Sequence, residues 1–395
     1  KFRTSYGVTG NNQIPNFQSL ASLKTQRYIF GDELFVGQVP NTVANPDLKW
    51  ETTAQYDVGV DMSFLDERIS ITADAYYKET TDLLLEIQLP PTSGFDTAIE
   101  NVGSISNTGF ELGISTINVE NDNFSWTSNF NISTNRTEVL DLGNRDEMFF
   151  SRVFNFNFRD EIMLRVGEEV GTFVGYIEDG IYNSQNEIDN SPVNNLLESV
   201  PGQVKFRDVN GDGVIDQNDR VIIGNTQPDF IGGLGNDFKY KNFDLSFFLR
   251  WSVGNDVVNG NGLFLDRVGQ GNWNTLGDYA NNAFSPLNPN ATFHGQVPNT
   301  YSNYMRSESI EDGSFLRIDY ITLGYTMPQK VIERINVKKF RVFARVNNPF
   351  LFTRYSWFDP EVSTGFGTAA KVGPGVDFAT YPRAITYSVG ATISL

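Results

Sequence analysis

The stretch from Gln55 to Lys78 constrains the fold more than any other part of the chain. Apolar residues occupy every second position on its first arm, the polar turn Asp66-Glu67-Arg68 follows, and the alternation then resumes. The apolar positions are Tyr56, Val58, Val60, Met62, Phe64, Ile69, Ile71, Ala73, Ala75 and Tyr77. Successive side chains of a strand point to opposite faces, so the pattern predicts a hairpin with one apolar and one polar face. Each arm has about ten residues, the length that a tilted strand needs to cross a membrane.

The same alternation recurs and predicts ten strands in total. Beyond the opening hairpin, the candidate strands lie at 2–9, 110–114, 124–132, 234–240, 243–251, 316–327, 340–346 and 384–395. The parity of the apolar positions changes near Tyr320, which predicts a β-bulge there. Short connections alternate strictly with long ones, which we expect to be loops. This arrangement is typical of an outer-membrane β-barrel with short periplasmic turns and long outer loops, and it directs the last strand toward the periplasm.

Composition agrees with a barrel and excludes other classes of protein. The 395-residue chain has no apolar run near the about 18 residues that a membrane helix needs. Its formal net charge of -18 argues against nucleic acid, which requires clustered lysine and arginine. This charge indicates either solvated loops or loops that bind cations or basic partners. The chain has no cysteine, and therefore no disulfide framework and no thiol chemistry.

Segments throughout the chain match a known pattern. They are 45–53 (NPDLKWETT), 64–69 (FLDERI), 76–84 (YYKETTDLL), 101–111 (NVGSISNTGFE), 201–202 (PG), 208–213 (DVNGDG), 315–325 (FLRIDYITLGY) and 358–362 (FDPEV). As a set, these segments resemble the SusC/RagA family, the TonB-dependent outer-membrane transporters of Bacteroidetes. The similarity covers essentially the whole chain in order. One departure is Leu395, where members of the family end in an aromatic residue.

The resemblance implies an all-β, antiparallel up-and-down transmembrane barrel of about 22 strands, of which residues 1–395 form the last ten or so. It implies active import of an oligosaccharide or oligopeptide across the bacterial outer membrane, energised by TonB. It also implies a SusD-like surface lipoprotein as partner and no enzymatic activity. Because the chain opens inside a strand pattern without a signal peptide, we expect the N-terminal plug and the TonB-contacting region to lie outside it.

Residues 208–219 (DVNGDGVIDQND) carry the strongest local site pattern. Oxygen ligands fall at positions 1, 3, 5, 9 and 12 of an EF-hand-like loop, and glycine occupies position 6, where such a loop turns sharply. The candidate ligands are Asp208, Asn210, Asp212, Asp216, Asp219 and the backbone carbonyl of Val214. Hard oxygen ligands at this spacing predict a structural Ca²⁺ site. The alternative is a turn rich in Asx and glycine that binds no metal.

Two further sets of side chains are candidates for contacts with other molecules. Aromatic residues in the long loops either recognise substrate or the lid lipoprotein, or pack the loops together; they are Trp273, Tyr279, Tyr301, Tyr304 and Trp357. Charged residues on the polar strand face are candidate plug or lumen contacts, although any wet barrel interior needs charge; they are Arg250, Arg317, Asp319, Arg341 and Arg345. His294 is the only histidine, and we expect it to be solvent-exposed.

Three functional hypotheses follow. The first is the importer barrel, and the second is a surface-exposed β-rich carbohydrate-binding protein or adhesin without transport. The third is a glycan-degrading enzyme, but no carboxylate pair and no phosphate-binding glycine loop stands out, so we expect no catalytic residues. The identity of the substrate does not follow from the sequence.

Overall fold

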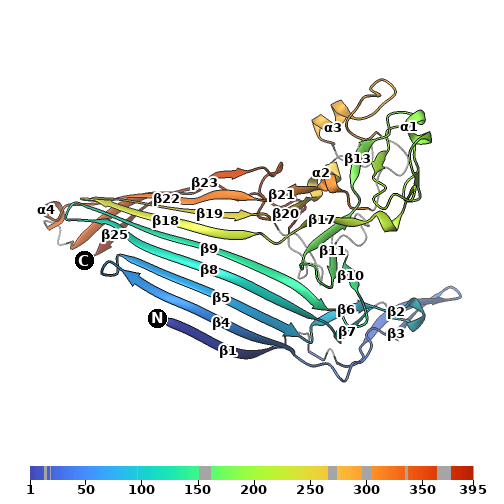
Figure 1. Cartoon of the computed structure of the whole chain (residues 1–395), viewed down its shortest axis with the longest axis horizontal. Coiled ribbons are helices and arrows are strands. Elements are labelled where there is room, and N and C mark those ends of the chain that lie inside the picture. Colours follow the sequence, from blue (N-terminus) through green and yellow to red (C-terminus); the bar gives the residue numbers. More distant parts are fainter. Residues whose placement is uncertain are drawn as a thin grey trace.

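A ten-stranded antiparallel sheet forms the body of the molecule in the computed structural model (Figure 1). The structure describes residues 1–12, 16–17, 19–95, 97–150, 162–265, 274–295, 304–333, 337–362 and 375–394. In spatial order the strands are β1 (Phe2–Asn11), β4 (Glu51–Phe64), β5 (Ile69–Thr81), β8 (Ser104–Glu120), β9 (Phe124–Asp141), β18 (Phe230–Tyr240), β19 (Phe243–Val253), β22 (Phe315–Thr326), β23 (Lys339–Thr353) and β25 (Thr386–Ser394). All ten strands predicted from the alternation are therefore confirmed.

Short and long connections lie at opposite ends of this sheet. The short ones span 65–68, 121–123, 241–242 and 327–338, and the long ones span 12–50, 82–103, 142–229, 254–314 and 354–385. Figure 1 shows the short turns at the left and the long connections at the right. Strand β25 runs toward the short-turn end, where Ser394 pairs with Lys339. The predicted segregation of the connections and the direction of the last strand are thus confirmed.

The two faces of the sheet differ as the alternation predicted. The face that carries Val58 and Val389, here called the apolar face, leaves their side chains 62% and 87% exposed. The opposite face, here called the polar face, carries charged and amide side chains. For example, Arg3 of β1 donates hydrogen bonds to Asp61 of β4 and to Asp74 of β5. A water-soluble sheet would cover its apolar face with a second layer, whereas a membrane-spanning sheet presents it to lipid.

The β-bulge predicted near Tyr320 is present at Asp319. Ile318 pairs with Leu249 and Tyr320 pairs with Phe248, so Asp319 has no partner on β19. The extra residue reverses the parity of β22 and lets apolar side chains continue on one face. It also brings the Asp319 carboxylate to the polar face, where it accepts a hydrogen bond of 2.7 Å from Nε of Arg250.

The long connections contain regular structure, so the expectation that they are loops is wrong in detail. Residues 12–50 form the hairpin of β2 (Leu23–Phe30) and β3 (Glu33–Pro40), and residues 82–103 form that of β6 (Leu84–Gln88) and β7 (Thr97–Asn101). A four-stranded sheet combines β10 (Glu147–Phe150), β11 (Ile162–Arg165), β12 (Thr172–Gly175) and β17 (Val221–Asn225). Three strands from two connections form another sheet: β20 (Asp256–Asn259) and β21 (Ile310–Asp312) from 254–314, and β24 (Val376–Asp377) from 354–385.

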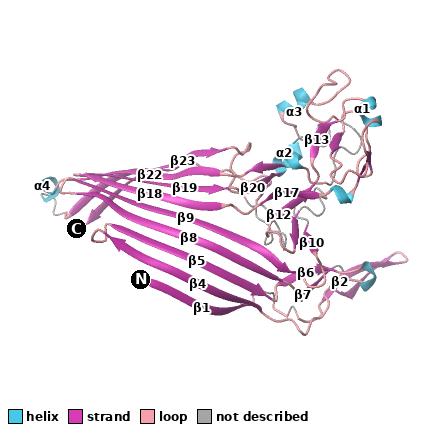
Figure 2. Ribbon diagram, in the orientation of Figure 1, coloured by secondary structure: helices cyan, strands magenta, loops and turns pink. Residues whose placement is uncertain are grey.

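Smaller elements complete these connections. Strand β13 (Glu178–Ile181) pairs with β15 (Val204–Phe206), and β14 (Val193–Asn194) pairs in parallel with β16 (Val214–Ile215). The helices of the long connections are α1 (Gln185–Asp189), α2 (Gly260–Leu265), α3 (Gly277–Asn282) and the 3₁₀ turns η1 (Pro91–Ser93), η2 (Gln217–Asp219) and η3 (Ser307–Ser309). Helix α4 (Gln329–Ile332) lies in the short connection 327–338. Figure 2 shows that the helices lie outside the ten-stranded sheet. Within the described ranges, no helix is long and apolar enough to cross a membrane.

The buried hydrophobic core lies in the long connections rather than in the ten-stranded sheet. Its largest cluster includes Leu142, Phe173, Val258, Met305 and Val376, which come from three of the connections and are all less than 9% exposed. Burying these side chains removes apolar surface from water and stabilises the connections as a folded unit. The long-connection end therefore provides rigid surfaces beside the polar face.

Candidate functional site: the polar face and the long connections

A buried ion-pair cluster fixes one long connection against the polar face. Arg317 is 2% exposed, and its guanidinium donates a hydrogen bond of 2.7 Å to Asp359. Its Nε lies 2.7 Å from the Glu361 carboxylate. Arg250 on the adjacent strand pairs with Glu361 and with Asp319. We call these five residues the Arg250–Arg317 cluster.

The charges in this cluster determine where the connection lies. Burying a charge costs several kcal/mol unless an opposite charge and hydrogen bonds compensate it. Asp359 is 5% exposed and Glu361 retains 13% of its side-chain exposure, so both carboxylates depend on the two arginines. Arg383, which is half-exposed, adds a longer contact of 3.4 Å to Glu361. The start of the 354–385 connection is therefore held over the polar face.

A cavity of about 600 Å³ opens beside the cluster at the long-connection end. Its wall includes Asn131 and Ser133 of β9, Phe248 and Ser252 of β19, and Phe315 of β22. The connections contribute Thr226, Asn255, Val257, Pro360, Glu361 and Val362. This volume lies within the range of about 300–1,000 Å³ that is usual for small-molecule sites.

Two further predicted contact residues, Arg341 and Arg345, lie on the polar face closer to the short-turn end of the sheet. Arg341 pairs with Asp244, and both side chains lie over Gly324, where a Cβ atom would be 2.5 Å from Asp244. The Arg345 guanidinium lies 4.0 Å from the ring centroid of Tyr320, and its Nε donates to Asn347. The structure thus brings Arg250, Arg317 and Asp319 together and places Arg341 and Arg345 separately. Contact of these five residues with a plug stays a prediction.

Sequence reasoning did not identify Asp244, Asp359 and Glu361 as partners of these arginines. In the sequence alone, the segment 358–362 (FDPEV) carries only a resemblance to a family pattern. Glu361 lies 111 residues after Arg250, and Asp359 lies 42 residues after Arg317. Two acidic residues flanking a proline were the available signal, but this signal does not specify which strand they contact.

The acidic loop at 208–219 is closed by hydrogen bonds from its own backbone. The Asp208 carboxylate accepts from the N–H groups of Gly211 (2.6 Å) and Gly213 (2.8 Å). Asp219 is fully buried and accepts from the N–H groups of Val209 and Asp216, both at 2.8 Å. Such bonds from side chain to backbone stabilise a tight Asx-rich turn. Both glycines have positive φ (75° and 85°), which residues with a Cβ rarely adopt.

The donor set of this loop has the chemistry that Ca²⁺ prefers, four carboxylates and an amide oxygen within twelve positions. The Asp212 carboxylate accepts hydrogen bonds from the Val214 N–H and from the Asn210 side-chain amide. The Asp216 carboxylate caps η2 by accepting a hydrogen bond from the Asn218 N–H. Among the described residues, no three acidic, histidine or cysteine side chains are already grouped as metal ligands. The loop therefore has suitable ligands that are directed toward its own backbone, and the calcium site stays a prediction.

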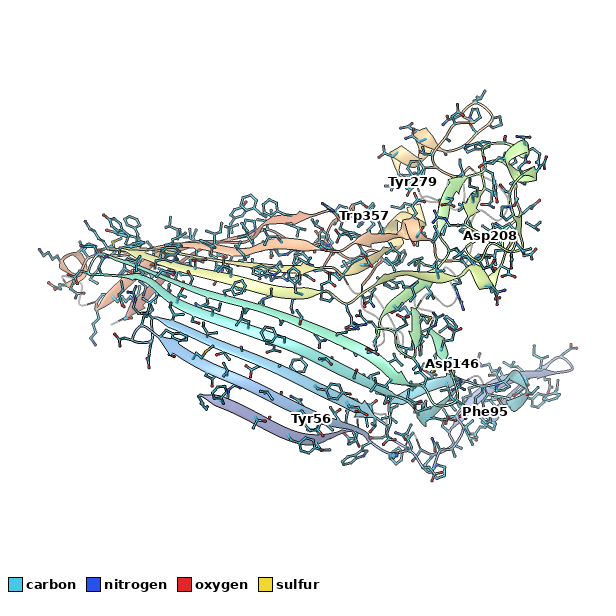
Figure 3. The ribbon with its side chains drawn as sticks, in the orientation of Figure 1. Tyr56, Phe95, Asp146, Asp208, Tyr279 and Trp357 are labelled. Atoms are coloured by element: carbon cyan, nitrogen blue, oxygen red, sulfur yellow. The ribbon has the colours of Figure 1, made fainter. Side chains whose placement is uncertain are left out.

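The described loop aromatics are engaged in ring contacts. Figure 3 shows two of them, Tyr279 and Trp357, in the long connections. Tyr279 packs edge-on against Phe293 with centroids 4.3 Å apart, and Trp357 packs against Phe358 at 5.1 Å. Tyr304 contacts Tyr176, whose burial raises the pKa of its phenol to about 12. These contacts stabilise the connections, and a role in recognition stays a prediction. Trp273 and Tyr301 lie outside the described residues, as does Leu395.

His294 is buried, so the expectation that it is solvent-exposed is wrong. Its side chain is 5% exposed, and Nδ1 lies 3.4 Å from the carbonyl oxygen of Gly295. The loop composition around it predicted exposure, but this connection folds onto itself, since Phe284 N–H donates to the Phe293 carbonyl. It also packs on the 142–229 connection, where Gly295 N–H donates to the Gly202 carbonyl.

Comparison with known proteins identifies the family. The family described as "TonB dependent receptor-like, beta-barrel" matches residues 1–348. TonB-dependent receptor P3 of Formosa agariphila is 34% identical over 393 residues, which are 99% of this chain and 39% of that protein. TonB-dependent receptor SusC of Bacteroides thetaiotaomicron is 32% identical over 405 residues, which are 100% of this chain and 37% of that protein. The chain thus spans about two fifths of the length of these relatives, whose names describe receptors and no enzyme.

The fold agrees with this assignment. The structure titled "Structure of the RagAB peptide transporter" superposes with a TM-score of 0.79 at 23% identity, covering 99% of this chain and 40% of that chain. Its closed-closed state superposes with a TM-score of 0.77. Proteins of this kind lie in the bacterial outer membrane, so the polar face lines a barrel lumen and the apolar face contacts lipid. The chain belongs to the family of TonB-dependent receptor-like β-barrels.

Proposed function

We propose that this chain is the C-terminal part of the barrel of an outer-membrane importer that takes up an oligosaccharide or oligopeptide with energy supplied through TonB. One observation carries the proposal. Ten antiparallel strands have one apolar and one polar face, and every long connection lies at the same end. The structure titled "Structure of the RagAB peptide transporter" shares this fold and supports a peptide as cargo, whereas the oligosaccharide alternative rests on the family resemblance of the sequence.

The long-connection end supports a surface lipoprotein of the SusD type as partner. The hairpin of β2 and β3 projects from this end in Figure 1. Its side chains Ile29, Phe30 and Val36 are 74%, 68% and 68% exposed. An isolated two-stranded hairpin with this much exposed apolar surface is marginal in water and favours a protein partner. Loop aromatics such as Tyr279 and Trp357 lie at the same end and are proposed as further contacts with the lid or substrate.

The polar face supports contact with a plug in the lumen, and the TonB contact is proposed to lie in sequence outside this chain.

We also propose that the loop at 208–219 binds one Ca²⁺ as a structural ion. The supporting observation is its set of hard oxygen ligands at EF-hand spacing around Gly213. The role of the ion would be to join the backbone of the loop to its carboxylates and so stiffen the connection that contains η2.

Growth and extraction experiments test the importer proposal. A strain that lacks the full-length gene should lose growth on one glycan or peptide source, and the gene should restore it only in the presence of TonB. Release of the protein from membranes by carbonate without detergent would contradict the barrel assignment. Normal growth of the deletion strain on every source, together with lost adhesion to a glycan surface, would favour the adhesin alternative.

A further inference from the structure

A row of polar side chains crosses the apolar face of the ten-stranded sheet. Thr116 of β8 pairs with Ser128 of β9, which pairs with Asn236 of β18, so the three side chains lie side by side on that face. Apolar neighbours flank the row on both sides, Ile69 of β5 and Phe247 of β19. Polar side chains are costly on a surface that contacts lipid, and where they occur they usually serve a function. The row is therefore a candidate contact for a polar ligand on the membrane side of the barrel.

Hydrogen bonds join this row into a continuous network. The Asn236 Oδ1 atom accepts from the Trp126 indole N–H at 2.9 Å and from the Ser128 hydroxyl at 2.7 Å. The Ser128 Oγ atom accepts from the Asn118 amide at 2.7 Å. In turn, Asn118 Oδ1 accepts from the Thr116 hydroxyl at 3.0 Å. We call these five residues the Thr116–Asn236 network.

The network leaves the NH₂ group of Asn236 unused. Because an indole N–H can only donate, its bond fixes the amide oxygen of Asn236 toward Trp126 and turns the NH₂ group away. Within the described chain this NH₂ group donates no hydrogen bond, and it is not one of the fully enclosed polar atoms. A donor that faces hydrocarbon is costly unless an acceptor meets it. The ligand of this group must therefore offer acceptor oxygens.

The depth of the network matches the ester groups of the periplasmic leaflet. Asn236 lies four residues before Tyr240, where β18 ends at the short-turn end. One row closer to the turns, Trp126 stacks on Phe238 with ring centroids 5.5 Å apart. Aromatic rows mark the interfaces of a barrel with the membrane. The network lies just inside such a row, where a phospholipid places its ester carbonyl oxygens, which only accept hydrogen bonds.

The turns beside the network carry charges of both signs. Arg68 donates from Nε and Nη2 to the carbonyls of Ile117 and Asn118, which leaves its Nη1 without a partner in the described chain. The Lys241 ammonium lies 5.5 Å from the ring centroid of Tyr240 and pairs with no described acid. Four acids lie in or beside the same three turns: Asp66, Glu67, Glu120 and Asp122. Two cations among four acids suit a headgroup that has both a phosphate and an ammonium group better than a purely anionic one.

From these observations we propose that the Thr116–Asn236 network and its turns bind one phospholipid of the periplasmic leaflet, phosphatidylethanolamine. The Asn236 NH₂ group donates to an ester carbonyl, Arg68 and Lys241 bind the phosphate, and the acids of the turns accept from the ammonium group. The acyl chains lie along the next apolar row, which contains Ile114, Phe130 and Leu234. This site is on the face opposite the lumen, so it is independent of the cargo and of the importer proposal.

Native mass spectrometry of the delipidated full-length protein in detergent measures the binding. The probes are phosphatidylethanolamine, phosphatidylglycerol and phosphatidylcholine with identical acyl chains. We expect phosphatidylethanolamine to bind most tightly, because phosphatidylglycerol lacks the ammonium group and that of phosphatidylcholine has no N–H to donate. Asn236→Leu should weaken its binding about tenfold, since the amide donors are lost. The matched control is Thr134→Val, on the same face of β9 but nearer the long connections, and it should bind as wild type.

Lys241→Met tests the headgroup contact without altering the network. The Lys241 ammonium bonds to no described side chain, so the folded band in heat-modifiability gels should persist while the affinity for phosphatidylethanolamine falls several-fold. Lys330→Met, which removes a cation of α4 at the same end of the sheet, should retain wild-type affinity.

Two results would overturn the lipid site. The first is equal binding of the three lipids, or unchanged affinity for phosphatidylethanolamine in both Asn236→Leu and Lys241→Met. The second is lost self-association of Asn236→Leu with lipid binding intact, which would assign the network to contact with a second copy of the protein.

Discussion

Arg3 and Asp74 form an ion pair across a strand that lies between them, with Nη1 2.8 Å from Oδ1. The intervening residue is Gly59 of β4, which pairs with Arg3 on one side and with Asp74 on the other. A Cβ atom at Gly59 would lie 2.2 Å from the Asp74 carboxylate and 2.8 Å from the Arg3 guanidinium. The glycine is therefore what allows charges on non-adjacent strands to meet on the lumen wall.

Gly59→Ala should destabilise the barrel by about 1–3 kcal/mol, because the methyl group displaces the ion pair and overpacks the wall. The measurement is the temperature at which the folded band is lost in heat-modifiability gels of the full-length protein. Gly113→Ala is the matched control: Gly113 lies on the polar face of β8 and is paired on both sides, as Gly59 is, and the nearest atom to a Cβ atom there is the Thr72 carbonyl oxygen at 4.0 Å. An equal effect of both substitutions would contradict the packing argument.

Arg317→Met should release the start of the 354–385 connection from the lumen wall. The substitution leaves Asp359 and Glu361 buried with one fewer cation, and removal of one partner from a buried pair typically costs about 3–5 kcal/mol. The expected result is faster protease cleavage within the connection on intact cells, with the barrel still heat-modifiable. Arg383→Met removes only a half-exposed contact to the same Glu361 and should leave the cleavage rate near that of wild type. Equal protection in both variants would show that other contacts hold the connection.

The sequence predicted the ten strands, the bulge and the face of each charged residue, because the two-residue period of a strand is a property of the backbone. Tyr56 and Asp57, for example, are assigned to opposite faces by position alone. The partners of Arg250 and Arg317 could not be predicted, since they depend on how a distant connection folds over the wall. The acidic residues at 359 and 361 contact these arginines only after that fold exists.

The alternation of apolar and polar residues likewise does not predict the strands within the long connections. Hairpin β2–β3 has apolar residues on both faces near its tip: Ile29 pairs with Leu34, and Tyr28 pairs with Phe35. No alternation results, so the segment is not recognisable as a strand pair. His294 shows the same limit, because local composition predicted exposure whereas long-range packing buries it.

The ion pair between Glu187 and Lys205 should make the outer connection sensitive to acid. Its Nζ–Oε1 distance is 2.7 Å, and the hydrogen bond from Lys205 is the main cause that lowers the pKa of Glu187 below its ordinary value of 4.5. Because the folded-state pKa is lowered, the pair stabilises the fold above pH 4.5, and this contribution is lost as the pH falls through the lower folded pKa.

Hydrogen exchange of α1 and β15 in the full-length protein, measured between pH 6 and pH 3, tests this prediction. Glu187→Gln should reduce protection at pH 6 and flatten the pH dependence of protection below pH 4.5, after correction for the intrinsic exchange rate. Glu198→Gln, in the same connection, is the control and should retain the wild-type profile. A Glu187→Gln profile parallel to that of wild type would contradict the assignment of the acid sensitivity to this pair.

Calcium should raise the thermal stability of the full-length protein through the loop at 208–219. A ligand that binds only the folded state at a hundred times its Kd adds about 2.7 kcal/mol, which corresponds to a shift of a few degrees. Asp212→Asn should abolish the shift, since it removes one ligand charge but keeps an oxygen to accept from Val214 N–H and so preserves the turn. Asp189→Asn, which alters an acidic residue of α1 outside the loop, should retain it. Equal melting temperatures in EDTA and in millimolar Ca²⁺ would mean that the loop closes on its own hydrogen bonds and needs no metal.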